Sequence, residues 1–497
     1  MSLSDAVRVG IETPTSTEEP VDVVAMLDDV LRPLGLSSAD AGGQVCFVGA
    51  DPIVPSTLRL GAAAGIGLVA KSVAIAKLWQ LRGGSGQDIT MDLRVAPHRL
   101  CPFYDQRWEL LNGYPQGAPA NPSNALGFMF HRTADDRWVM PLNPYPRIKL
   151  AAQKLLGVPD DVRAVSKAVR GWNGADLERA GAAAGVVMPL LRTTHEMLLE
   201  RQFTEVLEHL PLIEITRIGD SEPEPLTSGA PSPLAGVRAL GMGHVIAGAG
   251  CGRALALHGA EVLNVWRPGE LEHEITYVTA NVGVRSCTLD PRTAEGSGRL
   301  HDLLRGADVF YANRRPGYLD GIEMGAEQAA ALRPGIIHAT ASLHGESGPW
   351  VDRIGFDQTA GSVVGMLLRE GGGEVPALPP IVVVNDYIVS WFMTAGIVEA
   401  LMRRAVDGGS YKVHVSLTRV ALWILSLGVF DPAYAAETAG RPGEHAYLPP
   451  EQFSGDTPLG FYTGVTDQVR MSATPGGYQT ILVPRGSGRP EWQGANP

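Results

Sequence analysis

One carboxylate, Asp386, stands where an almost wholly apolar run meets a long amphipathic segment, in VPALPPIVVVNDYIVSWFMTAGIVEALMRR (Val375–Arg404). The pattern predicts an apolar strand that ends at Asn385 and a helix that begins near Asp386. Asp386 could cap this helix by accepting hydrogen bonds from its first free backbone N–H groups. The partial positive charge of a helix N-terminus also favours an ionised carboxylate that could attack a ligand. Residue types alone leave both roles open.

Other polar residues fall where predicted strands end, namely His244, Arg267, Asn313 and Arg314. The predicted strands are Gly236–Leu240, Ala260–Trp266, Asp308–Asn313 and Gly335–Ser342, and the predicted helices are Val245–His258, Gly298–Gly306 and Gly325–Arg333. This alternation favours a parallel sheet with helices on both faces. Such sheets bind ligands at the carboxyl ends of their strands. The four polar residues are therefore candidate binding residues.

Arg267 narrows the class of ligand. The loop GMGHVIAGAGCGRA (residues 241–254) is out of register with the dinucleotide fingerprint, since Ile246 stands where the third glycine belongs. Enzymes that bind NAD place Asp or Glu at the end of the second strand, whereas a phosphorylated ribose needs Arg. Arg267 therefore suits NADP or coenzyme A, and an ordinary solvated arginine at a turn is the alternative. In NRRPG (residues 313–317), anion recognition and a polar turn are equally open.

Composition excludes several classes of protein. The 497 residues carry a net charge of −12, which argues against nucleic acid or an anionic membrane as a partner. Four cysteines without a CxxC motif or a His/Cys cluster predict no disulfide framework and no metal site. The N-terminus is polar and acidic, and apolar stretches such as Leu60–Ala70 look too short to span a membrane. We expect a cytoplasmic protein.

The chain divides around DSEPEPLTSGAPSP (Asp220–Pro233), which is rich in Pro, Ser and acidic residues and predicts a linker. The part before it is mostly helical. A weak internal repeat relates Leu68–Ala96 to Met393–Ala421, each a helix, a Gly-Gly-Ser turn and a short strand. The alignment places Gly61 opposite Asp386, so only the second copy has a carboxylate there. Chance similarity of two Gly-rich amphipathic segments is the alternative.

Six blocks in the second half resemble the family III coenzyme A transferases, the CaiB/BaiF group that includes formyl-CoA transferase, carnitine CoA-transferase and α-methylacyl-CoA racemase. The blocks are PLAGVRAL (233–240), GRALALHGAEVLNVWRPG (252–269), NVGVRSCTLD (281–290), ADVFYANRRPG (307–317), RPGIIHATASLHGESGP (333–349) and RIGFDQTAGSVVGM (353–366). Their order and spacing make the resemblance specific, although no single block would.

The resemblance implies a function. Asp386 takes the place of the family's nucleophile, which forms an aspartyl–acyl anhydride. Arg267 and Asn313 take places that hold the CoA adenylate and phosphates, with Arg314 and His244 as further candidate CoA-binding residues. The expected activity is that of an acyl-CoA:carboxylate CoA-transferase, with acyl-CoA and a carboxylic acid as substrates and no permanently bound cofactor. The alternatives are an acyl-CoA racemase or lyase on the same fold, and a non-catalytic CoA-binding homologue.

The resemblance also implies an α/β fold, with a Rossmann-like large domain and a smaller α+β domain. Residues 1–220 resemble a second copy of the family's small domain and tail, through HRTADDRWVMPL (131–142) and AAAGVVMPLLRTTHEMLLERQF (182–203). We expect a linker at 221–234, a CoA-binding domain at 235–350, and the nucleophile-bearing helix with a small domain at 351–497. Family members are dimers, so a homodimer is expected, although the first half could supply partner contacts in cis.

Three departures from the family pattern bear on the chemistry. The family's lysine in NxGKRS is Val284 here, and the racemases' histidine in GHD is Phe356. The glycine-rich loop that covers the site in formyl-CoA transferase has only a poor counterpart in Gly117–Gly127. A phenyl ring cannot carry a proton, so we expect CoA transfer without inversion at the carbon next to the thioester. His344 could substitute for the missing histidine, although a turn residue is the alternative.

Overall fold

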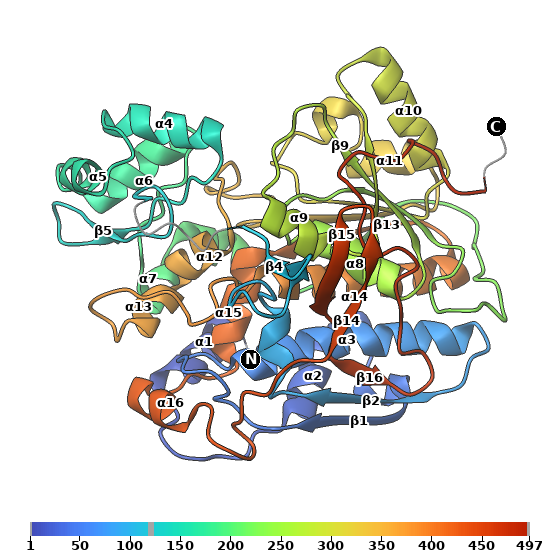
Figure 1. Cartoon of the computed structure of the whole chain (residues 1–497), viewed down its shortest axis with the longest axis horizontal. Coiled ribbons are helices and arrows are strands. Elements are labelled where there is room, and N and C mark those ends of the chain that lie inside the picture. The colour runs from blue at the N-terminus through green and yellow to red at the C-terminus, as the bar shows by residue number, and fades with distance from the viewer. Residues whose placement is uncertain (1, 118–123, 495–497) are drawn as a thin grey trace.

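The computed structural model describes residues 2–117 and 124–494. Its largest sheet has seven strands (Figure 1). Its order is β10-β9-β8-β11-β12-β13-β7, with only the edge strand β7 antiparallel. The strands are β7 (Glu214–Gly219), β8 (Arg238–Met242), β9 (Glu261–Trp266), β10 (Arg285–Thr288), β11 (Val309–Ala312), β12 (Ile337–Ser342) and β13 (Ser410–Ser416). The predicted α/β class with a large parallel-rich sheet is therefore confirmed.

Helices follow most of these strands along the chain. They are α8 (Ala249–Leu257), α9 (Glu274–Ala280), α10 (Ala294–Arg305), α11 (Ala326–Leu332), α12 (Asp357–Val364), α13 (Met366–Glu370), α14 (Asp386–Asp407), α15 (Leu417–Ser426) and α16 (Pro432–Thr438). Of these, α8, α11, α14 and α15 pack directly against the sheet. Along the chain, strands β8 to β10 are added on one side of β8 and strands β11 to β13 on its other side. The carboxyl ends of β8 and β11 therefore border a crevice, where α/β sheets bind ligands.

The first half of the chain forms two further parts. A layer of β1 (Gly42–Val48), β2 (Gln87–Asp92) and β16 (Val469–Met471) lies below α3 (Leu60–Leu81), with α1 (Leu3–Glu12) and α2 (Val23–Leu31) beside it (Figure 1). A helical lobe contains α4 (Pro146–Leu156), α5 (Val162–Val169), α6 (Gly174–Ala183) and α7 (Thr194–Met197). The predicted strand pair in this lobe is present as β5 (His131–Arg132) and β6 (Trp138–Val139), paired antiparallel.

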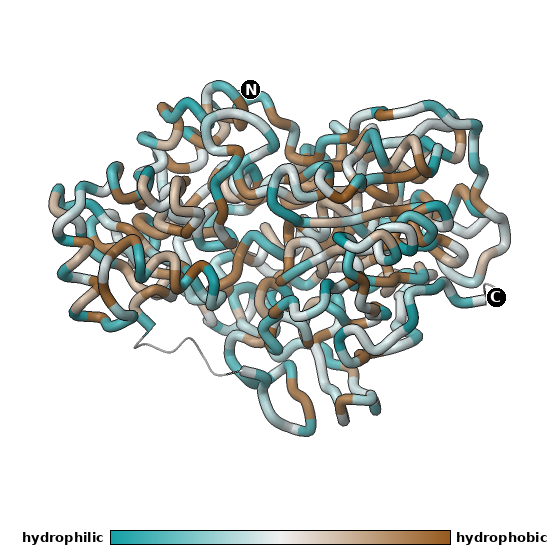
Figure 2. Tube along the Cα trace, turned by 90° about the horizontal axis from the view of Figure 1, so that it is seen from above, coloured by the Kyte–Doolittle hydropathy of each residue, from teal (hydrophilic) through white to brown (hydrophobic). Residues whose placement is uncertain are grey.

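Strands far apart in the sequence pair with one another and so connect the two halves of the chain. A four-stranded sheet joins β14 (Gln452–Thr457) and β15 (Gly460–Val465) to β3 (Leu110–Leu111) and β4 (Tyr114–Pro115). One large apolar core contains side chains from α3, α8, α14 and α15, and so spans both halves of the chain. Figure 2 shows hydrophobic stretches mainly inside the molecule and hydrophilic ones mostly along its outline.

The internal repeat has the predicted form in both copies. Helices α3 and α14 are each 22 residues long and pack against one another in the core. Each precedes a strand, β2 or β13, that pairs in parallel with an earlier strand, β1 or β12. Helix α3 is also long and apolar enough to cross a membrane, contrary to the length expected from Leu60–Ala70, but 94% of its 18-residue apolar window is buried inside the fold.

One sequence prediction is wrong. The apolar run before Asn385 forms no strand and instead crosses the molecule as an irregular segment. Three prolines in that run (Pro376, Pro379 and Pro380) explain the difference, because proline lacks the N–H that a sheet ladder needs. Asp386 is therefore presented at the junction of a loop and a helix.

Candidate functional site

A cavity of about 680 Å³ opens at the carboxyl ends of the parallel strands. All five sequence-predicted site residues line it: His244, Arg267, Asn313, Arg314 and Asp386. They come from the ends of β8, β9 and β11 and from the start of α14. The helical lobe contributes part of the wall through Tyr145 to Ile148, so both halves of the chain build this one cavity.

Asp386 occupies the first turn of α14 but does not cap it. The carboxylate of Asp357 instead accepts hydrogen bonds from the backbone N–H groups of Val384, at 3.1 Å, of Asp386, at 2.9 Å, and of Asn385. Among the residues that the structure describes, none donates a hydrogen bond to the Asp386 carboxylate, which is 7% exposed and lines the cavity. The capping role is thus taken by Asp357, and Asp386 keeps its oxygens free.

Burial disfavours ionisation of both Asp386 and Asp357. Burial raises the pKa of Asp386 well above its usual range, and the charge of Asp357 raises it further. Burial also raises the pKa of Asp357, to about 6, although the three backbone N–H groups oppose that rise. A carboxylate without protein donors in a buried cavity is a strong nucleophile once ionised, because no hydrogen bond from the described residues occupies its lone pairs.

The first copy of the repeat keeps the capping aspartate but lacks the nucleophile. Asp51 accepts hydrogen bonds from the backbone N–H groups of Gly61, at 2.9 Å, and Ala62, at 2.7 Å, at the start of α3. This repeats the arrangement of Asp357 at the start of α14. A Cβ atom on Gly61 would lie 2.7 Å from the Asp51 carboxylate. The start of α3 therefore leaves no room for an aspartate at the position that corresponds to Asp386.

Two of the predicted anion-binding arginines share one carboxylate. Glu270 pairs with Arg267 at 2.8 Å and with Arg314. Burial opposes ionisation of Glu270, but the charge of Arg314 and the hydrogen bonds from Arg267 outweigh it and lower its pKa to about 2. Arg267 keeps a third of its side chain exposed to the cavity, whereas Arg314 is buried and also bonds the Met242 carbonyl at 2.9 Å. Arg267 is thus the better placed of the two to meet a ligand phosphate.

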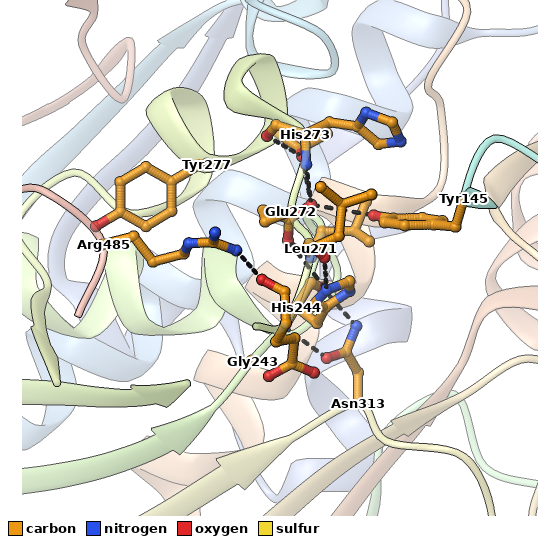
Figure 3. A network of polar contacts seen from close by, with 12 residues as sticks. Tyr145, Gly243, His244, Leu271, Glu272, His273, Tyr277, Asn313 and Arg485 are labelled. Carbon is orange, nitrogen blue, oxygen red and sulfur yellow. Dashed lines mark hydrogen bonds and ion pairs between the residues drawn. The ribbon is translucent and has the colours of Figure 1, made fainter. Parts of the chain in front are cut away.

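His244 and Asn313 bridge the crevice between β8 and β11. The Asn313 side chain accepts from the His244 backbone N–H at 2.8 Å and donates to the His244 carbonyl at 2.7 Å (Figure 3). Asn313 therefore fixes the loop after β8 and does not point freely into the cavity. Burial lowers the pKa of His244, and its Nε2 lies 3.1 Å from the Leu271 carbonyl.

Sequence reasoning missed Tyr145 and Glu272, which join the two halves at the cavity wall. The Tyr145 hydroxyl donates to Glu272 at 3.0 Å, and the same carboxylate accepts from the backbone N–H groups of Val245 and His273 (Figure 3). Tyr145 also stacks on Phe356, with ring centroids 6.0 Å apart and planes 15° apart. No local pattern marks Tyr145, because its partner Glu272 follows 127 residues later and Phe356 later still.

Val284, which replaces the family's lysine, and His344, the candidate substitute base, both lie outside the cavity. Val284 is buried in the main core and does not line the cavity. His344 is also buried away from it, with Nδ1 2.8 Å from the Thr418 hydroxyl, and burial lowers its pKa to about 3. The stretch Gly117–Gly127 lies partly outside the described residues. Within the described part of the chain, no cluster of His, Cys, Asp and Glu could hold a metal ion.

Comparison with known proteins identifies a relationship for the second half of the chain. Residues 234–463 match the model of CoA-transferase family III, which confirms the resemblance seen in the sequence. An acyl-CoA transferase of Fusarium pseudograminearum is 30% identical over 230 residues, which cover 41% of this chain and 50% of that protein. Succinyl-CoA–D-citramalate CoA-transferase of Chloroflexus aurantiacus is 30% identical over 199 residues, with coverages of 38% and 50%.

A solved CaiB/BaiF family protein from Brucella suis is 26% identical, with a TM-score of 0.35 and coverages of 38% of this chain and 55% of that chain. The chain thus spans about half the length of the curated relatives that it matches. Residues 1–233 lie outside the family match.

Proposed function

From the family III match of residues 234–463, we propose that this protein is an acyl-CoA:carboxylate CoA-transferase that works through an anhydride on Asp386. One observation carries the proposal. The carboxylate in the nucleophile's position lines the cavity with no hydrogen bond from the described residues, because Asp357 takes up the helix N–H groups.

In the first step, an Asp386 oxygen attacks the thioester carbonyl carbon, the C–S bond breaks and CoA thiolate leaves. The thiolate then attacks the aspartyl carbonyl of the mixed anhydride, which releases the donor acid and leaves an aspartyl-CoA thioester. The acceptor carboxylate displaces CoA from that thioester and forms a second anhydride. Attack of the thiolate on the acceptor's acyl carbon forms the new acyl-CoA and restores Asp386.

The other residues bind and orient the CoA portion. Arg267 would meet the ribose phosphate, while Glu270 holds Arg267 and Arg314 in place. Binding energy from this remote end would then position the thioester at Asp386. The N–H groups of Val384 to Asp386 are bonded to Asp357 and are therefore not free to stabilise an oxyanion. The strand order of the sheet is that of doubly wound nucleotide-binding folds and supports a Rossmann-like CoA domain.

Acyl exchange between a panel of CoA thioesters and free acids tests the proposal, with Asp386→Ala as the matched inactive variant. Exchange by the native protein and none by the variant would support it. Exchange that persists in the variant would exclude Asp386 as the nucleophile, and binding of CoA without any exchange would favour the non-catalytic alternative. The expected homodimer and cytoplasmic location stay predictions.

A further inference from the structure

The wall of the cavity is divided between charged and apolar residues. Arg267, Arg314 and Arg315 follow the ends of β9 and β11 and make one side basic. The side chains that come from the loop after β8, the end of β12, the segment before α12 and the start of α15 are largely apolar, namely Val245, Ala247, Leu343, Ile354, Phe356 and Leu417.

The apolar side is the one that adjoins Asp386. Phe356 directly precedes Asp357, whose carboxylate holds the Asp386 backbone N–H at 2.9 Å. Ser390, one turn along α14, bonds the carbonyls of Ile246 and Ala247 at 3.1 and 2.9 Å. The nucleophile is therefore placed between the phenyl ring of Phe356 and the loop that carries Val245 and Ala247.

Tyr145 closes this apolar part from the opposite half of the chain. Its ring lies nearly parallel to that of Phe356, and its hydroxyl is fixed by Glu272 at 3.0 Å. Burial raises the pKa of the Tyr145 phenol, with smaller contributions from the Glu272 and Asp386 charges, which agrees with a ring enclosed near the nucleophile. A second ring, that of His273, lies 4.7 Å from Tyr145 and limits its movement.

Arg147 and Arg315, which line the cavity and lie near one another on its basic side, form no ion pair among the described residues, whereas the cations beside the apolar part are already engaged or carry little charge. The Arg353 guanidinium pairs with Glu178 at 3.2 Å and lies 4.3 Å from the Trp350 ring centre. His244 has a lowered pKa because of burial, so it carries little positive charge at neutral pH. An acyl group that ended in a second carboxylate would have to bury that charge among the apolar side chains of this part, unless it reached Arg147 or Arg315 on the basic side, and such burial is strongly unfavourable.

We propose that the acyl pocket, defined by Tyr145, Phe356, Leu343 and Leu417, takes carboxylic acids whose chain is apolar to its end, branched or aromatic, and rejects dicarboxylic acyl groups. Tyr145 sets the depth of the pocket and is a specificity-determining residue supplied by the first half of the chain. This assignment rests on the proposed transferase function, since it names the substrate class of the same site.

Two thioesters of matched shape test the assignment, 4-methylpentanoyl-CoA and succinyl-CoA, which differ by an isopropyl group in place of a carboxylate. We expect kcat/KM to favour 4-methylpentanoyl-CoA by about a hundredfold. Dissociation constants measured by calorimetry with Asp386→Asn, which binds without turnover, should show the same preference. A native protein or variant that prefers succinyl-CoA, or treats the two alike, would overturn the assignment.

Variants of Tyr145 test its role separately. Tyr145→Ala should deepen the pocket and raise the preference for 3-phenylpropanoyl-CoA over 4-methylpentanoyl-CoA about tenfold or more, whereas Tyr145→Phe should leave this ratio unchanged. An unchanged ratio in the folded alanine variant would remove Tyr145 from specificity. If no thioester is exchanged at all but the binding preference holds, the transferase proposal fails and the pocket assignment stands.

Discussion

Replacement of Asp386 by asparagine should abolish acyl exchange and at the same time stabilise the fold. The carboxylate is 7% exposed, has no hydrogen-bond donor among the described residues, and faces the charge of Asp357. Burial and that charge raise its pKa, so the ionised form weakens the native state at neutral pH. Asparagine keeps the shape of the side chain and removes the charge.

The size of the gain follows from the buried charge of Asp386. Burial and the charge of Asp357 raise the pKa of Asp386 above its usual value of 3.8, and each pKa unit corresponds to about 1.4 kcal/mol. A buried polar group without a partner costs about 1–3 kcal/mol by itself. We therefore expect Asp386→Asn to raise the free energy of unfolding by about 1–3 kcal/mol, which in a chain of this length is a rise of about a few degrees in Tm.

The sign of the pH dependence is fixed by the direction of the pKa shift. A carboxyl with a raised folded pKa contributes stability that is complete below its unfolded pKa of 3.8 and is lost as the pH rises through the folded pKa. The advantage of the asparagine variant should therefore be largest at pH 8 and shrink towards pH 4. Urea unfolding followed by circular dichroism at several pH values measures it.

Asp467→Asn is the matched control because its carboxylate is ion-paired. Lys71 and Arg99 lower the pKa of Asp467 to about 2 against the opposing effect of burial. This substitution should destabilise the protein at pH 7, and the loss should shrink only as the pH falls from about 4 towards 2. If Asp386→Asn is also destabilising at pH 8, the view of Asp386 as a strained, unpartnered carboxylate is wrong.

Three further outcomes are expected. Arg267→Ala should weaken binding of CoA more than binding of dephospho-CoA, by about 1.5–3 kcal/mol in calorimetry, and equal losses would mean that Arg267 does not contact the ribose phosphate. Lys71→Met should lower the free energy of unfolding by about 3–5 kcal/mol, because it leaves Asp467 buried without its main partner; a loss below about 1 kcal/mol in urea unfolding would contradict this. In D2O, a 2-methylacyl-CoA should gain no deuterium at its α-carbon, as measured by NMR, because Phe356 cannot carry a proton and His344 lies outside the cavity. Rapid incorporation of deuterium that depends on Asp386 would instead favour a racemase.

Local periodicity in the sequence predicted the alternating strands and helices of the large parallel sheet. The predicted strands and helices between residues 236 and 342 match β8, β9, β11 and β12 and helices α8, α10 and α11 to within a few residues, whereas α9 and β10 were not predicted. The repeat was visible because α3 and α14 keep the same length and the same Gly-Gly-Ser turn. Alternation of strands and helices then sufficed to place the candidate residues at one edge of the sheet.

The contacts that define the site were beyond local patterns. Asp357 lies 29 residues before Asp386, and no pattern in either segment predicts that the Asp357 carboxylate caps the helix that begins at Asp386. Tyr145 reaches Glu272 across 127 residues, and Lys71 reaches Asp467 across 396. Such pairs depend on how the two halves of the chain pack together. The sequence therefore predicted which residues are candidates for the site, but their hydrogen-bond partners became clear only from the structure.

Trapping of the acyl-enzyme tests the central claim most directly. The protein is mixed with an acyl-CoA that it exchanges, hydroxylamine is added during turnover, and the digested chain is examined by mass spectrometry. The account predicts a hydroxamate on Asp386, in the peptide that begins after Arg369, and none in Asp386→Asn. A hydroxamate on another residue, or complete acyl exchange with no trapped carboxyl, would contradict it.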